Sequence, residues 1–347
     1  MLAWLVFFLS AIISVWASHI RALTSADSPS FDPLPSAPIF LTSSSNGSTI
    51  HPLFETIVAF GDQWSDDGRG AFKLTGGEWP VDPAYFRHRF TDGLTWVEQL
   101  ARGLSISSSS LAVAGATTNN TLAQGMTGPS YDTPVRSVNE QVSFFIKSTP
   151  VRPNALYLLQ GGLNDFLLGQ YQGLRGEEAA ESLGNAMLQL VRYGARYILL
   201  LNLPSLATLP YTAHLNPFAQ PTLTNFSRAF REKLYEYDRP RSAVAIVDWY
   251  ALFEGFLDRP AVFGFEGGTL DEACLTGVYG ECPSVYLCAT PGTRIWFDQV
   301  RLLRPLLFGL ATLTSHYEKF NPTNPTHFYM ASLAYQVLRT QGWVELR

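Results

Sequence analysis

TIVAFGDQWSDDG, residues 56–68, is the stretch on which the fold of this chain depends. Its first five residues are apolar or β-branched, as in a buried strand, and they run into a Gly-Asp turn with polar, helix-starting residues behind it. In an open α/β sheet, side chains at the carboxyl end of a strand line the crevice where ligands bind. We therefore predict a strand over 56–60 and a candidate site at Asp62 and Gln63.

Short apolar runs alternate with amphipathic segments along the rest of the chain. The expected strands cover 56–60, 111–113, 155–160, 197–202 and 243–248, and the expected helices cover 93–103, 137–147, 177–193 and 225–237. Strands separated by helices of this length indicate βαβ units and a parallel sheet covered on both faces. We predict a single three-layer α/β/α domain with about five parallel strands.

The first 17 residues have the features of a secretory signal peptide. Leu2–Trp16 is apolar and uncharged but short for a membrane span, and Val15 and Ala17 provide small residues for cleavage after Ala17. No Lys or Arg precedes the apolar run, so a signal anchor is the alternative. Residues 18–50 form a Ser/Thr/Pro-rich leader, and 51–347 the domain. We expect a secreted, extracellular protein with no membrane contact after cleavage.

Two further features fit secretion. Glycosylation sequons occur at Asn46, Asn119 and Asn225. Three cysteines, Cys274, Cys282 and Cys288, cluster within 15 residues. In an oxidising compartment one pair would bridge and one thiol would remain free.

Composition excludes several classes of function. The formal net charge is −5, and because no Lys/Arg-rich run occurs we expect no nucleic-acid partner. No histidine lies among the cysteines and no Cys-x-x-Cys occurs, so we expect no metal, and likewise no cofactor. The Gly-x-Ser-x-Gly elbow of α/β-hydrolases is missing from the sequence. We expect a monomer.

Gly61 and Asp62 open a segment that resembles the first block of the SGNH/GDSL ester hydrolases. That block reads Gly-Asp-Ser, followed by an acid and a glycine, and here Gln63 stands at the position of the nucleophilic serine. A glutamine amide has no ionisable group and cannot form an acyl-enzyme intermediate. Ser65 would point about 200° away around a helix, so we interpret it as a first-turn or capping residue.

Two later segments resemble the next blocks of the same family. They are LAVAGATT, residues 111–118, and GGLNDF, residues 161–166. The resemblance implies that Gly115 and the Asn164 amide donate to the oxyanion, with Asp62 in support. On the residues alone, a tight strand-exit turn at Gly115 and a helix cap at Asn164-Asp165 are the alternatives. The resemblance extends from Phe54 to the C-terminus and implies the flavodoxin-like fold of fungal secreted acetylesterase-like members.

The last block departs from the family pattern, which reads aromatic-Trp-Asp-x-x-His-Pro-Thr. Asp298 matches the triad acid, but Arg301 stands at the histidine position and opens a Leu-rich stretch, 301–320, without a family counterpart. Joining Val300 to Asn321 restores the spacing, with Asn321 in place of the base. Residues 301–320 are then a lineage insertion or a retained intron, and a transcript spanning them in frame would dispose of the intron. We expect Arg301–Pro305 as a surface helix or loop that separates the two halves of the block.

The resemblance also bears on a histidine and on the cysteines. His327 lies six residues beyond the normal histidine position, and we favour a structural histidine at a helix start over a replacement base. The family spacing implies a Cys274–Cys288 disulfide with Cys282 free. Three tryptophans, Trp79, Trp96 and Trp296, are sugar platforms or core residues, and we favour the core.

The family activity implied by the resemblance is hydrolysis of carboxylic esters, with a small ester or acylated glycan, chiefly acetylated carbohydrate, as ligand. Because Gln63 replaces the nucleophile and Asn321 or Arg301 the base, we predict impaired catalysis. A silent relative that binds glycans or acyl ligands in the old crevice is one alternative. A decayed gene product, or one read through a retained intron, is the other.

Overall fold

The computed structural model describes residues 49–169, 173–213, 220–238, 243–267, 272–279, 286–303, 316–318 and 321–346. All of them belong to one compact unit of the chain, Ser36–Arg347. The predicted signal peptide, Asn46 and Cys282 lie outside the described residues, as does the leader up to residue 48.

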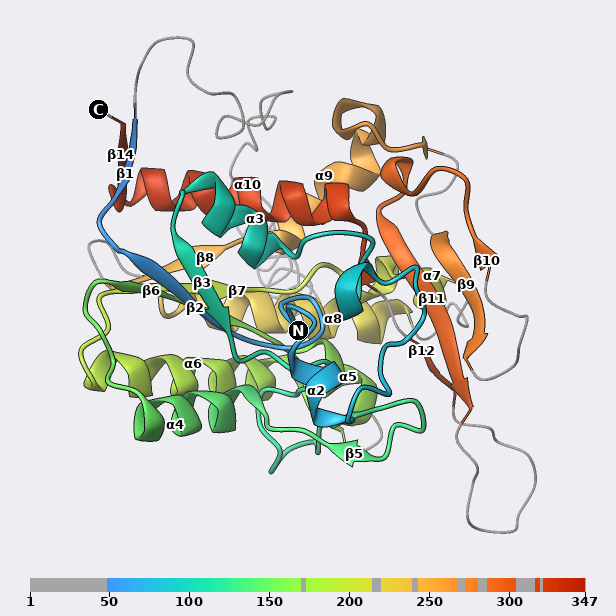
Figure 1. The fold of residues 1–347 in the computed structure, drawn as a ribbon, viewed down its shortest axis with the longest axis horizontal. Helices are drawn as coiled ribbons and strands as arrows, with labels where there is room; N and C mark the ends of the chain where they lie inside the picture. Colours follow the sequence, from blue (N-terminus) through green and yellow to red (C-terminus); the bar gives the residue numbers. More distant parts are fainter. Residues whose placement is uncertain are drawn as a thin grey trace, which may run out of the picture. The chain divides into compact units, whose positions relative to one another are not determined.

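A parallel sheet of five strands forms the centre of this unit, in the order β3-β2-β6-β7-β8. The strands are β2 (Thr56–Phe60), β3 (Ser107–Ser110), β6 (Ala155–Gln160), β7 (Tyr197–Leu201) and β8 (Val244–Val247). Helices α3 (Trp96–Gly103) and α10 (Asn324–Thr340) cover one face, and α4 (Val138–Ser148) and α6 (Gly176–Arg192) cover the other (Figure 1). The predicted three-layer α/β/α architecture is confirmed.

Burial explains why the central strands could be predicted from their sequences. Every residue of β6 is buried, and β7 and β8 are buried almost throughout, as continuous apolar runs require when helices cover both faces. The helices begin at residues that cap them. Thr95 and Glu98 form a capping box on α3, and Ser137 and Glu140 form one on α4.

The strand predicted over 111–113 is wrong in position, because the regular strand is the all-serine β3. This strand lies at the sheet edge with its side chains alternately exposed and half-buried, so it carries no apolar signal. Residues 111 and 113 still bond to the β2 segment, through Leu111 N to Ala59 O at 2.8 Å and Val113 N to Gly61 O at 3.1 Å. The apolar run therefore follows β2 beyond the end of the strand.

The sequence suggested a helix directly after β2, but none begins there. Residues 63–65 form a turn, and α2 (Gly70–Leu74) starts later. The buried Asp66 carboxylate accepts hydrogen bonds from the backbone N–H groups of Gly68, Gly70, Ala71 and Ala114, at 2.8–3.1 Å. These bonds wrap the loop around one carboxylate and join it to the segment after β3.

A second sheet, which the sequence did not predict, flanks the first (Figure 1). It contains β9 (Ala273–Tyr279), β10 (Tyr286–Leu287), β11 (Trp296–Leu303), β12 (His316–Glu318) and β13 (Asn321–Pro322). β11 runs parallel to β9 and antiparallel to β12 and β13.

The prediction of a surface helix or loop at 301–305 is wrong for the part that the structure describes. Residues 301–303 continue β11, and Arg301 pairs with Glu318 of β12. The halves of the last block are not separated either, because β13 pairs Asn321 with Asp298. Residues 301–303 leave the block along β11 and residues 316–318 return antiparallel to them as β12, so both described parts of the stretch belong to the same sheet.

The remaining helices complete the layers and the loops between them. They are α5 (Leu163–Gly169), α7 (Pro210–Ala213), α8 (Gln220–Tyr235) and α9 (Trp249–Asp258). The two ends of the described chain meet in an antiparallel pair, β1 (Ile50–Pro52) with β14 (Val344–Leu346). None of the helices described is long and apolar enough to cross a membrane.

Candidate active site

The exit from β2 is held by two glutamines from neighbouring elements. Gln141 of α4 accepts from Gly61 N and donates to Gly61 O, both at 2.9 Å. Gln160, the last residue of β6, donates to Asp62 Oδ2 at 2.9 Å, while Asp62 Oδ1 accepts from Trp64 N at 3.0 Å. These buried hydrogen bonds fix the positions of Gly61 and Asp62, the two residues that precede residue 63.

Gln63 lies against the two donors that the family resemblance implies. Its side-chain oxygen Oε1 accepts a hydrogen bond from Gly115 N at 3.2 Å and another from Asn164 Nδ2 at 2.9 Å. These distances are those of a donor pair that receives an oxyanion. The structure thus brings Gly115 and Asn164 together on one acceptor, the side chain of Gln63, and their role as oxyanion donors stays a prediction.

Local backbone geometry explains why the donors converge. Gly115 has φ +90°, and a Cβ there would stand 1.8 Å from the carbonyl oxygen of Met126, so only glycine fits. Asn164 is held by a second bond, from Nδ2 to Ala116 O at 2.9 Å. The neighbouring Asp165 accepts from Thr118 N and Oγ1. The alternative of a helix cap at Asn164-Asp165 holds only in part: the Asn164 amide donates across to the other block, whereas Asp165 accepts from Gly162 N at the start of α5.

Two carboxyl groups beneath the site are held away from water. Burial raises the pKa of Asp62 to about 7, even though hydrogen bonds from Trp64 and Gln160 oppose the shift. Burial likewise raises the pKa of Asp165 to about 6 against its bonds from Thr118. These groups act as anchors of the two blocks, since both are fully enclosed by the residues that they bind.

Asp298 and Asn321 form the second half of the site. Asn321 Nδ2 donates to both carboxylate oxygens of Asp298, at 3.0 and 2.8 Å, and Asn321 N donates to Oδ1 at 2.8 Å. Tyr85 Oη donates to Asp298 Oδ2 at 2.7 Å. The sequence did not reveal Tyr85, which is 213 residues away in the chain. Asn321, rather than Arg301, therefore occupies the place beside the acid.

The Asn321 amide is oriented by the carboxylate that it faces. A carboxylate only accepts, so the amide nitrogen must point toward it and the oxygen away from it. Asn321 Oδ1 is buried and has no hydrogen-bond partner among the described residues. A histidine here would offer a basic ring nitrogen on its far side, whereas an amide oxygen takes no proton near neutral pH.

Aromatic packing joins the two halves of the site. Trp64, next to Gln63, packs against Trp296 at the start of β11, with ring centroids 6.3 Å apart. One buried apolar cluster contains Ala114, beside Gly115, and Phe297, beside Asp298. Trp296 is itself 1% exposed, and Trp79 and Trp96 are fully buried, so these tryptophans belong to the core as favoured and are not sugar platforms.

Neither residue weighed as a substitute catalyst reaches the donor pair. Ser65 Oγ is buried and bonded to Gln160 Oε1 at 3.2 Å and to Trp96 Nε1 at 3.1 Å. His327 Nδ1 accepts from Trp96 N at 3.2 Å, and burial lowers the pKa of this histidine to about 3. Both side chains serve the core: His327 caps the start of α3, and Ser65 ties its turn to β6, although it is not the helix cap expected.

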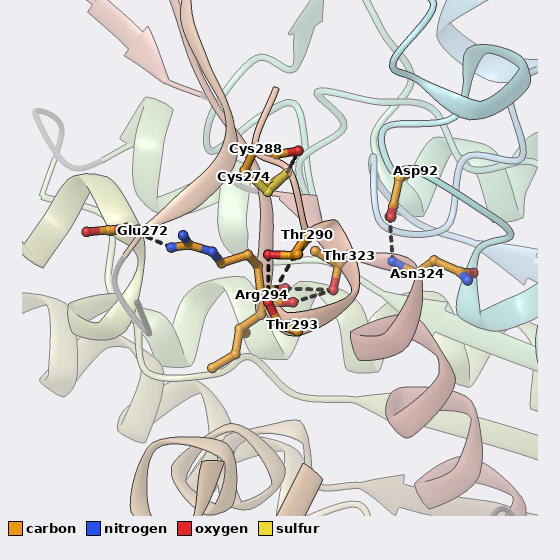
Figure 2. Close-up of a disulfide and its surroundings, with 10 residues drawn as sticks. Asp92, Glu272, Cys274, Cys288, Thr290, Thr293, Arg294, Thr323 and Asn324 are labelled. Atoms are coloured by element: carbon orange, nitrogen blue, oxygen red, sulfur yellow. Dashed lines mark hydrogen bonds and ion pairs between the residues drawn. A yellow bond between two sulfur atoms is a disulfide. The ribbon is translucent and has the colours of Figure 1, made fainter. Parts of the chain in front are cut away.

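A disulfide and three polar contacts fasten the second sheet beside the site (Figure 2). Cys274 and Cys288 are bridged, with Cα atoms 4.8 Å apart, as the family spacing implied. Arg294 pairs with Glu272 at 2.6 Å, Thr323 Oγ1 donates to Arg294 O at 2.7 Å, and Asn324 N donates to Asp92 Oδ1 at 2.6 Å. The disulfide joins β9 to the residue after β10, and the polar contacts join the segments before β11 and at the start of α10 to their neighbours.

The structure describes two of the predicted glycosylation sites and the residues that could hold a metal. Asn225 is exposed on α8, and Asn119 is partly exposed with its side chain bonded to Thr121 of its own sequon. Within the described ranges, no group of three or more His, Cys, Asp or Glu side chains is arranged to hold a metal.

Comparison with known proteins gives one family and several distant relatives. Residues 57–267 match the GDSL-like lipase/acylhydrolase family. The chain is 28% identical to phosphatidylcholine-sterol acyltransferase of Aeromonas hydrophila over 66% of its own length and 68% of that protein. It is 25% identical to thermolabile hemolysin of Vibrio parahaemolyticus over 64% of its own length and 52% of that protein.

Among solved structures, a carbohydrate esterase family 2 enzyme of Corynascus thermopiles, which carries a carbohydrate-binding domain, is 16% identical. The match covers 83% of this chain and 67% of that one with a TM-score of 0.42, a likeness too distant to bear on function.

Proposed function

Because this chain belongs to the GDSL-like lipase/acylhydrolase family, we propose that it is a secreted ester-hydrolase scaffold whose catalytic machinery is out of use. The observation that carries the proposal is the pair of hydrogen bonds from Gly115 N and Asn164 Nδ2 to Gln63 Oε1. A substrate carbonyl needs those two donors in the transition state. They are already engaged by a side chain that cannot act as a nucleophile.

The atoms of Gln63 stand in for an acylated serine. In an acyl-serine, the chain Cβ–Oγ–C=O ends with its carbonyl oxygen on the oxyanion donors. In glutamine, Cβ–Cγ–Cδ=Oε1 has the same number of bonds, with a methylene in place of the ester oxygen. The side chain therefore reproduces the bound acyl group, but through a carbon–carbon bond that water does not cleave.

The base position supports the same reading. Asn321 keeps the hydrogen bonds to Asp298 that orient a triad histidine, and it lacks a group that accepts a proton. In a serine hydrolase, removing the nucleophile or the base costs on the order of a millionfold in turnover, and removing both costs little more. Two substitutions with intact surroundings fit a site that has lost chemistry while keeping its fold.

The ligand class and location are also part of the proposal. The motif resemblance favours acetylated carbohydrate as the ancestral substrate, whereas one relative of this chain is named for phosphatidylcholine, so both ester classes belong in the test. Export is supported by the Cys274–Cys288 disulfide, because such bonds persist in oxidising compartments. We further propose a monomer that acts without nucleic acid, cofactor or membrane attachment. The retained-intron explanation of 301–320 stands as the alternative to a genuine insertion.

Turnover of esters by the purified full-length protein tests this proposal. p-Nitrophenyl acetate, an acetylated xylan and phosphatidylcholine would be supplied in parallel, together with a serine-directed fluorophosphonate label. We expect no turnover above that of an Asn164→Ala variant, and no labelled serine. Turnover accompanied by a labelled serine would overturn the proposal, because it would require a nucleophile other than residue 63.

A further inference from the structure

An open cavity of about 960 Å³ lies next to the exit from β2, since Gln141, which holds Gly61, is one of its lining residues. It is formed by α2, the segment from Leu111 to Gln124, the end of β5 (Thr133–Pro134) and α4. Its lining includes neither Gln63 with its donors Gly115 and Asn164 nor the pair of Asp298 and Asn321. Its size is at the upper end of the range of pockets that enclose a single small-molecule ligand.

The cavity lining is positively charged, whereas the whole chain is negatively charged. The whole protein has a formal charge of −5, yet the lining contains four basic residues and one acidic residue. Arg69 is paired with Asp67, but Lys73, Arg136 and Lys147 form no ion pair with any described residue. The acidic residue, Glu140, is engaged in the cap of α4 and accepts from Asn120 Nδ2 at 2.7 Å. The cavity therefore carries a net positive charge that the described protein leaves unbalanced.

Apolar side chains make up much of the remaining lining. Leu74 and Phe144 are 48% and 47% exposed, so both present apolar surface to the cavity that they line. Val113 contributes further apolar surface, and the Arg136 guanidinium lies 4.4 Å from the centre of the Phe144 ring. Apolar walls with unpaired cations at the rim suit a ligand that has both a hydrocarbon part and a negative charge.

We propose that this cavity binds a single anionic amphiphile, a molecule with one alkyl or acyl chain and an anionic head group. The chain would lie on Leu74, Val113 and Phe144, and the head group would meet Lys73 and Lys147 at the last turns of α2 and α4. A concave site of this volume fits one such molecule better than a flat lipid surface. An acidic glycan would leave the apolar lining unused.

Binding of dodecanoate below its micellar concentration, measured by calorimetry on the full-length protein, tests this site. 1-Dodecanol supplies the same chain without charge, and dodecyl phosphate distinguishes a phosphate from a carboxylate head group. We expect both anions to bind, dodecanol to bind at least tenfold more weakly, and each two-carbon shortening of the chain to weaken binding by about tenfold. Binding of the anions should also weaken as salt is raised.

A matched pair of variants separates this cavity from general charge effects. Lys73→Glu with Lys147→Glu should weaken dodecanoate binding more than tenfold. Arg192→Glu with Arg339→Glu makes the same charge change at the last turns of α6 and α10, outside the cavity, and should leave binding as in the wild type. If the first pair fails to fold, Lys73→Gln with Lys147→Gln replaces it.

Three outcomes would overturn the proposal. They are equal binding of dodecanoate and dodecanol, equal loss in both pairs of variants, or binding seen only with micelles or anionic vesicles. The proposal does not rest on loss of esterase activity, because binding here and turnover at Gln63 depend on different residues and are measured separately.

Discussion

Asn321 directs its side-chain amide to both carboxylate oxygens of Asp298, from a position 23 residues further along the chain. The intervening segment leaves along β11 and returns along β12 and β13, so it brings these two residues together rather than separating them. The geometry of an acid with its partner is therefore complete, and only the chemistry of the partner differs.

Restoring the two missing groups should restore catalysis without any deletion. We expect Gln63→Ser with Asn321→His to hydrolyse p-nitrophenyl acetate on the order of 10³-fold faster than either single variant, since nucleophile and base act as a unit. Each single variant should stay near the wild-type background. A folded but inert double variant would mean that the assignment of these two positions is wrong.

Asn164 offers a test of the donor pair through stability. Its amide donates to two oxygens, Gln63 Oε1 and Ala116 O, so Asn164→Asp would place a carboxylate against two acceptors. We expect Asn164→Ala to lower the free energy of unfolding by about 1–3 kcal/mol, and Asn164→Asp to lower it further at pH 7. Urea denaturation at pH 7 and pH 4 measures both, and the extra loss should shrink at pH 4 as the new carboxyl is protonated.

Tyr85 should support Asp298 in a measurable way. Tyr85→Phe removes the hydroxyl that donates to Asp298 Oδ2 and keeps the buried ring. We expect a loss of about 1–2 kcal/mol in the free energy of unfolding. Tyr193→Phe, at a tyrosine that is 63% exposed, is the matched control and should change it by less than about 0.5 kcal/mol. Equal effects of the two variants would contradict the assigned contact.

His327 should make the protein less stable in acid. Because burial lowers the pKa of His327 to about 3, its contribution to stability is full above the unfolded pKa of 6.5 and is lost as the pH falls toward 3. Between pH 7 and pH 5 the loss is about 2 kcal/mol. His327→Gln should remove that loss, as seen by comparing urea unfolding of both proteins at the two pH values.

Asp62 and Asp165 oppose this trend, so the comparison with the variant is needed. Burial raises their pKa values to about 7 and about 6. Their contribution to stability is therefore present below the ordinary Asp pKa of 3.8 and lost as the pH rises through the raised values. If His327→Gln keeps the full acid loss of the wild type, the buried histidine is not its source.

The Cys274–Cys288 disulfide should stabilise the second sheet. It closes a loop with a sequence separation of 14, and replacing both cysteines by alanine should lower the free energy of unfolding by about 3 kcal/mol. Peptide mapping of the unreduced protein should find these two residues linked and Cys282 as a free thiol. A link from Cys282 to either neighbour would contradict the pairing.

The central layers were predictable because their signals are local. β2, β6 and β7 are apolar runs buried on both faces, and the caps at Thr95 and Ser137 mark helix starts in the sequence. The serine strand β3 was not predicted, because an edge strand is stabilised by its hydrogen bonds to the neighbouring strand and does not require an apolar pattern. The second sheet was missed although its strands all lie between Ala273 and Pro322, because strands as short as β10 and β13 show no period in the sequence.

The candidate site divides in the same way. Gly115, Asn164 and Asp298 were identified from short motifs, and the structure brings Asn164 and Gly115 to one oxygen. Tyr85 and the occupant of that oxygen position were not identified. A motif shows which residue is replaced. The contacts of the Gln63 side chain with Gly115 and Asn164 depend on the assembled fold, so the motif does not show them.

The bond pattern of Gln63 has a use beyond this protein. Serine hydrolases hold their acylated state only until water attacks it, which makes that state difficult to observe. A serine-to-glutamine substitution in an active relative would place a permanent amide carbonyl on the oxyanion donors, as Gln63 does here on Gly115 and Asn164. Such a variant would be a genetically encoded, stable analogue of the intermediate, suited to crystallography and to trapping the partner that normally accepts the acyl group.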